Sequence, residues 1–319
     1  MKIPTNHYCS MTNGFVVILD IHFGKKCNIR LDNTEDVIEQ KLTEILEYCL
    51  SNKIRYIIIA GDVFDNCSID RKTFMKAYNI FKKFKDNGIH VFTIYGNHDE
   101  YRYNPEFRNN TPLKDLQDLE VITTIDSEDS IEVVDDYEDT TYMIYGYPYV
   151  ETDKLKSTRI SYQERKDAYQ VIIGHTFYDN EFMGGENNIT EDDLESINCD
   201  YLILGHDHSY YEPERVFNTD VFRFGSLVRG TSSTNDLQRK VKFMHFYGDG
   251  EWKEIDLDIK DLKEVTTAKA TVKEDKVDFN ELIEEIKIIE NETEEMDTIL
   301  EAINNLENEK VKEIIRRNI

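Results

Sequence analysis

The stretch Tyr95-Gly96-Asn97-His98-Asp99-Glu100 reads as the end of a strand that runs directly into a polar loop. Residues 89–94 supply the predicted strand, because β-branched and aromatic residues follow the turn-forming Gly88. Gly96 lets the backbone turn where a side chain would clash. The loop then presents an amide, an imidazole and two carboxylates in a row. An amide oxygen can ligate a metal ion, and an imidazole can ligate one or move a proton. A single loop of this kind is common, so its meaning depends on the rest of the chain.

Two continuous apolar runs precede this strand, at residues 14–19 and 56–60, and each is typical of a strand buried on both faces. Amphipathic helical patterns follow them, at residues 34–49 and 70–86. The order strand, helix, strand, helix, strand predicts a parallel sheet with right-handed crossovers. Further strands are predicted at residues 142–147, 171–173, 201–204, 221–224 and 241–247, and a short capped helix at 190–194.

Length and composition divide the chain into two parts. A chain of 319 residues can form one large domain with an appendage, or two domains. After about Asp258 the sequence becomes rich in Glu, Lys and Ile and contains no histidine. We therefore expect a main domain over residues 1–258 and a small α/β or helical cap over residues 259–319, which would also dock a partner.

Cysteine usage and charge limit the cellular setting and the partners. Five cysteines at irregular spacing predict free thiols in a reducing compartment. The start of the sequence lacks the apolar core of a signal peptide, and no run approaches membrane-spanning length, so we expect a cytoplasmic protein without a membrane partner. The formal net charge of −26 disfavours broad, sequence-independent binding of nucleic acid.

Two segments combine aromatic and basic residues. In the predicted helix at 70–86 the aromatic residues recur at spacings of four and three, which places them on one face. A core-facing stripe with a solvated basic back explains this pattern better than a platform for stacking bases. The loop at residues 101–108 directly follows the Asn-His turn and lacks helical spacing, so it is the better candidate for substrate contact.

Five predicted strands each end in a small polar cluster. Because active sites in open α/β sheets lie at the carboxyl ends of strands, the five clusters can converge on one place. Five of the eight histidines lie in them, and a lone Gly-Asp or Gly-His would more often be an ordinary loop. The clusters are Asp20-x-His22, Gly61-Asp62-x-x-Asp65, Gly96-Asn97-His98-Asp99, Gly174-His175 and Gly205-His206-x-His208.

The side chains in these clusters favour a two-metal site. This set of carboxylates, imidazoles and one amide is typical of sites that bind Mn²⁺, Fe or Zn²⁺. It contains no thiolate, so it fits a structural zinc site less well. Seven ligands are too many for one tetrahedral ion, but they fit two ions roughly 3.5–4 Å apart that share a bridging carboxylate. Such a pair of ions clamps a phosphate and activates a water molecule for in-line attack.

The order DxH, GDxxD, GNHD, GH, GHxH over about residues 14–248 resembles the calcineurin-like metallophosphoesterases. The resemblance implies an α/β fold, a four-layer αββα sandwich. It also implies that His98 is the general acid or transition-state stabiliser, oriented by Asp65. By motif, the implied ligands are Asp20, His22 and His208 for one metal ion, Asn97, His175 and His206 for the other, and Asp62 as the bridge.

Within that family, the layout is most similar to the phage and bacterial SbcD-type repair nucleases. Three segments carry this resemblance: Asp20-Ile21-His22-Phe23-Gly24, Gly61-Asp62-Val63-Phe64-Asp65 and Gly225-Ser226-Leu227-Val228-Arg229. It implies a DNA exo- or endonuclease in repair or recombination, with DNA and an SbcC/Rad50-like ATPase as partners. It also implies two divalent metal ions, with Mn²⁺ as the first candidate and Fe, Zn²⁺ or Mg²⁺ as alternatives. A homodimer is a further alternative for the assembly, and a phage-encoded protein would act in the host cytoplasm.

Two alternatives stay open. A phosphoesterase for small substrates, such as cyclic nucleotides, nucleotides or phosphoproteins, needs no basic surface, so the net charge slightly favours it. The expected cap and the aromatic loop favour the nuclease. A non-catalytic subunit that retains the fold is disfavoured, because a decayed site usually loses ligands and this set is complete.

Overall fold

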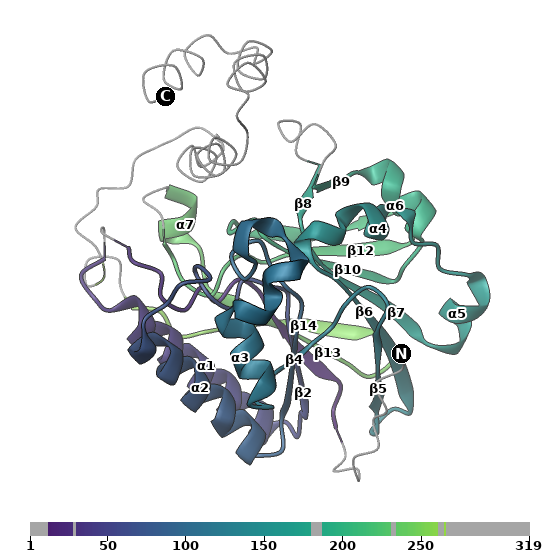
Figure 1. Ribbon diagram of the computed structural model, residues 1–319. Helices are drawn as coiled ribbons and strands as arrows, with labels where there is room; N and C mark the ends of the chain where they lie inside the picture. The colour runs from purple at the N-terminus through teal and green to yellow at the C-terminus, as the bar shows by residue number, and fades with distance from the viewer. Residues whose placement is uncertain (1–11, 28–29, 180–186, 231–233, 261–264, 266–319) are drawn as a thin grey trace, which may run out of the picture. The chain divides into compact units, whose positions relative to one another are not determined.

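The computed structural model describes residues 12–27, 30–179, 187–230, 234–260 and 265. The chain divides into two units, residues 1–271 and 272–319, and every described residue belongs to the first. In that unit two six-stranded sheets pack face to face, and helices cover the outer face of each (Figure 1). This arrangement confirms the predicted αββα sandwich. The predicted cap over residues 259–319 lies almost wholly outside the described residues.

The first sheet has the strand order β14-β13-β1-β2-β3-β4. Strands β1 to β4 are parallel, as predicted for the three apolar runs, and β13 and β14 add an antiparallel edge. The strands are β1 (Phe15–Ile18), β2 (Tyr56–Ile59), β3 (His90–Thr93), β4 (Thr123–Thr124), β13 (Lys242–Tyr247) and β14 (Glu251–Asp256).

The second sheet has the strand order β11-β12-β10-β7-β6-β5. Its four central strands are parallel, and the outer strands β5 and β11 are antiparallel to their neighbours. The strands are β5 (Ser130–Asp135), β6 (Thr140–Tyr147), β7 (Tyr169–His175), β10 (Tyr201–Gly205), β11 (Tyr211–Val216) and β12 (Thr219–Arg223). A separate pair joins β8 (Phe177–Tyr178) to β9 (Asn188–Ile189).

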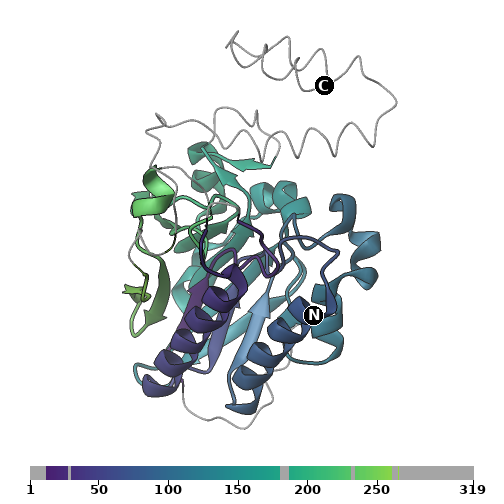
Figure 2. The same ribbon diagram turned by 90° about the vertical axis from the view of Figure 1, so that its left-hand side faces the viewer.

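Two long helices cover the first sheet and lie side by side on it (Figure 2). Each begins at a capping side chain: Asn33 accepts from the Asp36 amide, and Asp70 accepts from the Thr73 amide. Shorter helices cover the second sheet. The α-helices are α1 (Thr34–Ser51), α2 (Arg71–Asp86), α3 (Pro112–Asp118), α4 (Thr152–Ser157), α5 (Tyr162–Asp167), α6 (Glu191–Ile197) and α7 (Thr234–Gln238). The 3-10 helices are η1 (Tyr101–Tyr103), η2 (Pro105–Asn110) and η3 (Tyr149–Glu151).

The alternation of side chains along the strands builds three layers of core. Phe15 and Val17 of β1 face the second sheet, while Val16 and Ile18 face α1 and α2. The layer between the sheets is strongly aromatic. Phe246 stacks on Phe15 with 5.1 Å between ring centroids. Because both sheets are buried on both faces, their carboxyl edges are held in fixed relative positions.

The aromatic stripe of α2 confirms the core-facing interpretation. Phe81 and Phe84 are fully buried, and Phe74 and Tyr78 pack against the same cluster. The basic side of this helix is largely neutralised by ion pairs. The pairs are Lys76 with Glu35 and Asp36, Lys82 with Asp86, Lys83 with Glu39, and Lys85 with Glu120.

Strands β11 and β14 were not predicted from the sequence. Both lie at a sheet edge, and both are rich in charged residues, so neither shows a buried apolar run. Among the described residues, no helix is both long enough and apolar enough to cross a membrane.

Replacing Phe246 by Ala should lower the free energy of unfolding by about 3–5 kcal/mol, because it leaves a cavity between the two sheets. Phe217, which is 55% exposed, offers a matched control, and Phe217→Ala should change stability by less than about 0.5 kcal/mol. Urea unfolding followed by circular dichroism measures both. Equal effects of the two substitutions would contradict this account of the core.

Candidate metal centre

The carboxyl ends of β1, β2, β3, β7 and β10 meet at one place, and the structure brings all seven predicted ligands together there. One group consists of Asp20, His22, Asp62 and His208, whose ligand atoms lie within 4.8 Å of one another. The Nε2 atoms of His22 and His208 are 2.9 Å apart. The Oδ2 atom of Asp62 lies 3.5 Å from His22 Nε2.

A second group forms on the other side of Asp62. The Oδ1 atom of Asn97 lies 3.0 Å from His175 Nε2 and 3.1 Å from His206 Nδ1. His175 Nε2 is also 3.3 Å from Asp62 Oδ2. Asp62 therefore belongs to both groups, as a bridging carboxylate must.

The hydrogen bonding of His175 calls for a cation at this position. Its Nδ1 donates to the Ala60 carbonyl oxygen at 2.7 Å, so in the neutral ring the lone pair lies on Nε2. That lone pair faces two acceptor oxygens, from Asn97 and Asp62. Three lone-pair atoms at these distances repel unless a proton or a metal ion lies among them.

Asp62 Oδ2, the atom that both groups share, is buried and has no hydrogen-bond partner among the described residues. Buried polar atoms are normally satisfied, so an unsatisfied carboxylate oxygen at this position fits metal ligation. The donor groups contain no thiolate, which agrees with a catalytic metal site and not with a structural zinc site.

The histidine ligands differ in whether they carry a proton at neutral pH. Burial lowers the pKa of His22 to about 4, with a further effect of the Lys25 charge, and burial lowers the pKa of His206 and His208 well below the ordinary value. These three rings are neutral at pH 7, as metal ligation requires. Burial also acts on His175, but the carboxylates of Asp62 and Asp20 outweigh it and raise its pKa to about 9.

The backbone at the centre is strained. Asp20, His22, Asp62 and His206 all have positive φ, from 42° to 91°, a region that non-glycine residues rarely adopt. Close approach also requires glycine. A Cβ atom on Gly96 would lie 2.0 Å from Asp62 Oδ1. The strain is concentrated where ligands must turn toward one point.

The two residues that were predicted to be catalytic lie beside these groups. His98 is half-buried, and its Nδ1 donates to the main-chain carbonyl oxygen of Asp65 at 2.6 Å. The carboxylate of Asp65 lies 3.4 Å from Nδ1 of His22. The sequence suggested that the Asp65 carboxylate orients His98, whereas in the structure the Asp65 main-chain carbonyl oxygen accepts the hydrogen bond from His98 Nδ1.

The family model of calcineurin-like phosphoesterases matches residues 15–210, which include every ligand described above. The chain belongs to this family. It is therefore a metal-dependent phosphoesterase, a hydrolase that uses divalent metal ions.

Several curated relatives of this phosphoesterase are named DNA double-strand break repair protein Mre11. The protein of Thermoplasma acidophilum is 24% identical over 221 residues, which cover 67% of this chain and 54% of that protein. The protein of Sulfurisphaera tokodaii is 24% identical over 73% of this chain and 57% of its own length. The protein of Methanocaldococcus jannaschii is 24% identical over 87% and 74%. The chain thus spans little more than half the length of the first two relatives.

Asp99 is a buried residue of the phosphoesterase centre to which the sequence analysis gave no role. Its carboxylate accepts hydrogen bonds from the backbone amides of Val63, Phe64 and Gly96, at 3.0–3.2 Å. These bonds join the loop after β2 to the loop after β3. Burial and the nearby Asp62 charge raise the pKa of Asp99 to about 7. In the sequence, only the position of Asp99 directly after Asn97-His98 pointed to a role at this centre.

Aromatic side chains enclose the second group of ligands. The rings of Tyr149 and Phe177 lie 5.3 Å and 4.2 Å from the His206 ring. Tyr103 lies 5.5 Å from Tyr149 and belongs to the loop that was predicted to contact substrate. That loop therefore lies close to the phosphoesterase centre.

The affinity of the phosphoesterase for Mn²⁺ should rise with pH between 7 and 9. In the metal-free protein His175 carries a proton over this range, since its pKa is about 9, and a metal ion must displace that proton. The dissociation constant of the site that includes His175 should fall about tenfold per pH unit and level off above pH 9. Electron paramagnetic resonance of bound Mn²⁺ at low micromolar concentration measures it.

A matched pair of variants checks the cause. His175→Gln should remove the pH slope, whereas His90→Gln, which changes an exposed histidine of β3, should keep it. An affinity that is flat from pH 7 to pH 9 in the unmodified chain would rule out a protonated His175.

Proposed function

We propose that this chain is a DNA nuclease, a two-metal phosphodiesterase that acts in DNA repair or recombination. The observation that carries the proposal is the pair of ligand groups that share Asp62, with the half-buried His98 beside them. The similarity to curated proteins named for DNA double-strand break repair supports DNA as the substrate.

In the proposed site, Asp20, His22 and His208 would hold one metal ion, and Asn97, His175 and His206 would hold the other, with Asp62 between them. Bound divalent ions, with Mn²⁺ as the first candidate, would supply a nucleophile at neutral pH and balance the phosphate charge. His98 would hold a proton at the leaving oxygen. The bond from its Nδ1 to the Asp65 carbonyl fixes the ring, so Nε2 is the nitrogen that faces away from this carbonyl.

Lys25 would bind the phosphate backbone next to the scissile bond. It follows the His22 turn, and its amide donates to the His22 carbonyl oxygen at 3.1 Å. Its positive charge acts on His22, Asp65 and His208. Among the described residues it has no ion-pair partner. In a chain of net charge −26, a half-buried lysine that lies beside the metal centre and forms no ion pair among the described residues favours an anionic substrate.

The loop at residues 101–108 would contact the bases. Tyr101 and Phe107 are 50% and 41% exposed, and their rings meet edge to face at 5.9 Å. Exposed aromatic rings stack on unpaired bases without reading their sequence. The loop is anchored by Arg108, which binds Glu100 and Asp126 and lies over the Tyr95 ring.

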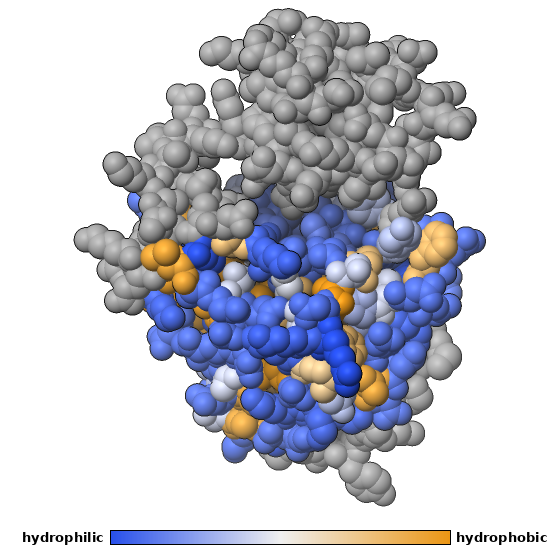
Figure 3. Space-filling view, turned by 60° about the vertical axis from the view of Figure 1, so that its left-hand side comes forward, coloured by the Kyte–Doolittle hydropathy of each residue, from blue (hydrophilic) through white to orange (hydrophobic). Residues whose placement is uncertain are grey.

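The acidic surface limits how much DNA the chain can hold alone. Figure 3 shows the face over α1 and α2 as largely hydrophilic, and ion pairs engage four of the six basic residues of α2. Further DNA contacts would come from an SbcC/Rad50-like ATPase, or from a homodimer. Co-purification with the ATPase and gel filtration test these partners. The free thiols of Cys27, Cys49, Cys67 and Cys199 favour a cytoplasmic setting.

The neutralised basic helix also supports a second candidate, a phosphoesterase for small substrates. A nucleotide or cyclic nucleotide needs no basic surface beyond the metal centre and Lys25. This candidate and the nuclease differ in whether the exposed aromatic loop is used.

Hydrolysis assays with Mn²⁺ test the proposed function. The substrates are linear duplex DNA, single-stranded DNA, bis-p-nitrophenyl phosphate and a phosphomonoester. We expect cleavage of DNA and of the small diester. His98→Ala should lower the rate at least about 100-fold, because proton transfer to the leaving oxygen is lost, and should retain Mn²⁺ binding.

Two results would contradict this proposal. Cleavage of only the small diester or the monoester would favour the small-substrate candidate. Loss of Mn²⁺ binding together with activity in His98→Ala would mean that His98 supports the metal centre and is not the proton donor.

Replacing Lys25 by Ala should raise the KM for DNA about tenfold and change kcat less, because it removes a charged phosphate contact and no metal ligand. The neighbouring exposed Lys26 supplies the control, and Lys26→Ala should change KM by less than about twofold. Steady-state kinetics on single-stranded DNA measure both. Equal KM values for the two variants would exclude Lys25 from substrate binding.

A further inference from the structure

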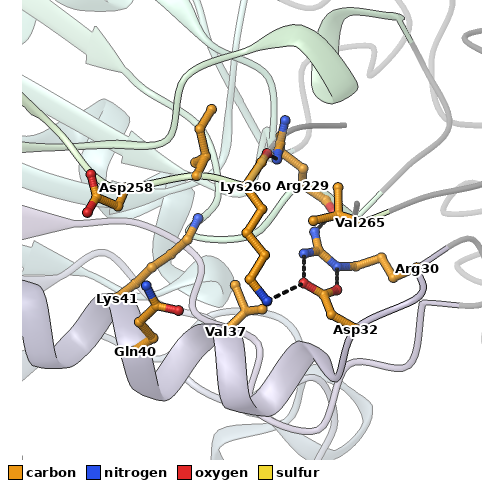
Figure 4. Close-up of a pocket in the computed structure, with 10 residues that line it drawn as sticks. Arg30, Asp32, Val37, Gln40, Lys41, Arg229, Asp258, Lys260 and Val265 are labelled. Carbon is orange, nitrogen blue, oxygen red and sulfur yellow. Dashed lines mark hydrogen bonds and ion pairs between the residues drawn. The ribbon is translucent and has the colours of Figure 1, made fainter. Parts of the chain in front are cut away.

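A cavity lies apart from the metal centre, and none of the metal ligands lines it. Its volume is about 220 Å³, far more than the roughly 10–15 Å³ that one ordered water molecule requires. It lies between α1, the segment before α1, and the segments around residues 229 and 260 (Figure 4). The charged residues that line it are Arg30, Asp32, Lys41, Arg229, Asp258 and Lys260.

The charge of this cavity is opposite to the charge of the whole chain. Four of its lining residues are cationic and two are carboxylates, so the excess is 4 − 2, or two positive charges, in a chain of net charge −26. One of the two carboxylates is already shared. Arg30 binds Asp32 through two nitrogens, at 2.7 and 2.9 Å, and Lys260 lies 3.9 Å from the same side chain.

Two cations of the cavity are buried without a carboxylate partner among the described residues. Lys41 is 4% exposed, and its Nζ donates to the Leu227 carbonyl oxygen at 3.0 Å. Arg229 is 5% exposed and donates to the carbonyl oxygens of Leu237 and Lys260, at 2.8 and 3.0 Å. Carbonyl oxygens satisfy hydrogen bonds but do not balance a full charge, so this arrangement is costly.

The neighbouring residues increase the positive field. The charge of the buried Arg239 acts on Lys41 and Arg229, and although Arg239 pairs with Asp236, its Nη1 has no hydrogen-bond partner among the described residues. Burial, with the charges of Arg239, Arg229 and Arg30, lowers the pKa of Lys41 to about 7. A neutral donor would hold the Leu227 carbonyl equally well, so support of this loop alone does not explain four cations around one open space.

We propose that this cavity binds a phosphate dianion, either inorganic phosphate or the terminal phosphate of a nucleotide, through Lys41, Arg229 and Lys260. Its negative charge is opposite to the positive excess of the lining. Guanidinium and ammonium groups are the side chains that bind phosphate oxygens most strongly. The cavity shares no lining residue with the metal centre, and phosphate binding there does not require the proposed nuclease activity.

Isothermal titration calorimetry on the full chain, stripped of metal by a chelator, tests the site. The ligands are inorganic phosphate, a nucleoside 5′-monophosphate and the corresponding nucleoside. We expect saturable binding of one phosphate per chain and no binding of the nucleoside. Stronger binding of the monophosphate would identify a nucleotide as the source, and stronger binding of inorganic phosphate would identify the free anion.

Three variants locate the binding. Lys41→Gln should weaken phosphate binding at least about tenfold, since a charge-assisted bond is lost while an amide can still donate. Lys260→Met, at the exposed rim, should weaken it about threefold. Lys72→Met removes the same charge from an exposed position on α2 and should have no effect.

The outcomes separate folding from binding. Thermal unfolding reports whether the Lys41→Gln variant is folded. If it is not folded, phosphate binding by the Lys260→Met variant tests the proposal, because the exposed Lys260 side chain donates no buried hydrogen bond and its loss should not affect folding. The proposal is overturned if neither phosphate compound binds saturably. It is also overturned if phosphate binds but Lys260→Met and a folded Lys41→Gln bind it as tightly as the unmodified chain does.

Discussion

A fully buried carboxylate between two groups of histidines is the constraint on which the rest of this structure depends. Asp62 lies within 3.5 Å of ring nitrogens of both His22 and His175, and it accepts the His98 amide at 3.0 Å. Burial alone would raise its pKa, but His175 and its neighbours hold that pKa well below the ordinary value. A charge in this position is tolerable only with cations around it, so the fold must bring five strand ends to one point.

The connections that meet this constraint are short and specialised. Positive φ at Asp20, His22, Asp62 and His206 turns each loop at the residue that carries the donor atom. Asp99 then fixes the loop after β2 to the loop after β3 through three backbone amides. The sandwich behind these loops is rigid because both sheets are packed on both faces, and a rigid support is what a strained site needs.

The parts of the fold that could be predicted are those in which one local pattern decides the outcome. The apolar runs at 14–19, 56–60 and 201–204 are buried on both faces, so they identify strands without any knowledge of neighbours. The strand ends then place the polar clusters. The edge strands β11 and β14 could not be found in this way, because their stability comes from pairing with β12 and β13 and not from their own composition.

The details of the site that escaped prediction depend on contacts between distant segments. Motif order places Asp65 near His98, but it does not tell a backbone carbonyl from a carboxylate as the partner. The lysines of α2 suggested a basic surface, and only the folded chain places Glu35, Glu39 and Glu120 opposite them. Lys41 has the sequence context of an ordinary helix residue, and its burial depends on the loop that packs over α1.

The main chain of Leu227 has a mechanical consequence. Its N–H donates to the Asp20 carbonyl oxygen at 3.0 Å, and its C=O accepts from Lys41 Nζ at the same distance. The N–H and the C=O belong to two successive peptide groups that are joined at the Cα atom of Leu227, so a single residue lies between the two partners. Helix α1 and the backbone that carries a metal ligand are therefore connected in series. A sliding movement of this helix along the sheet must turn the Leu227 backbone or break one of these two hydrogen bonds.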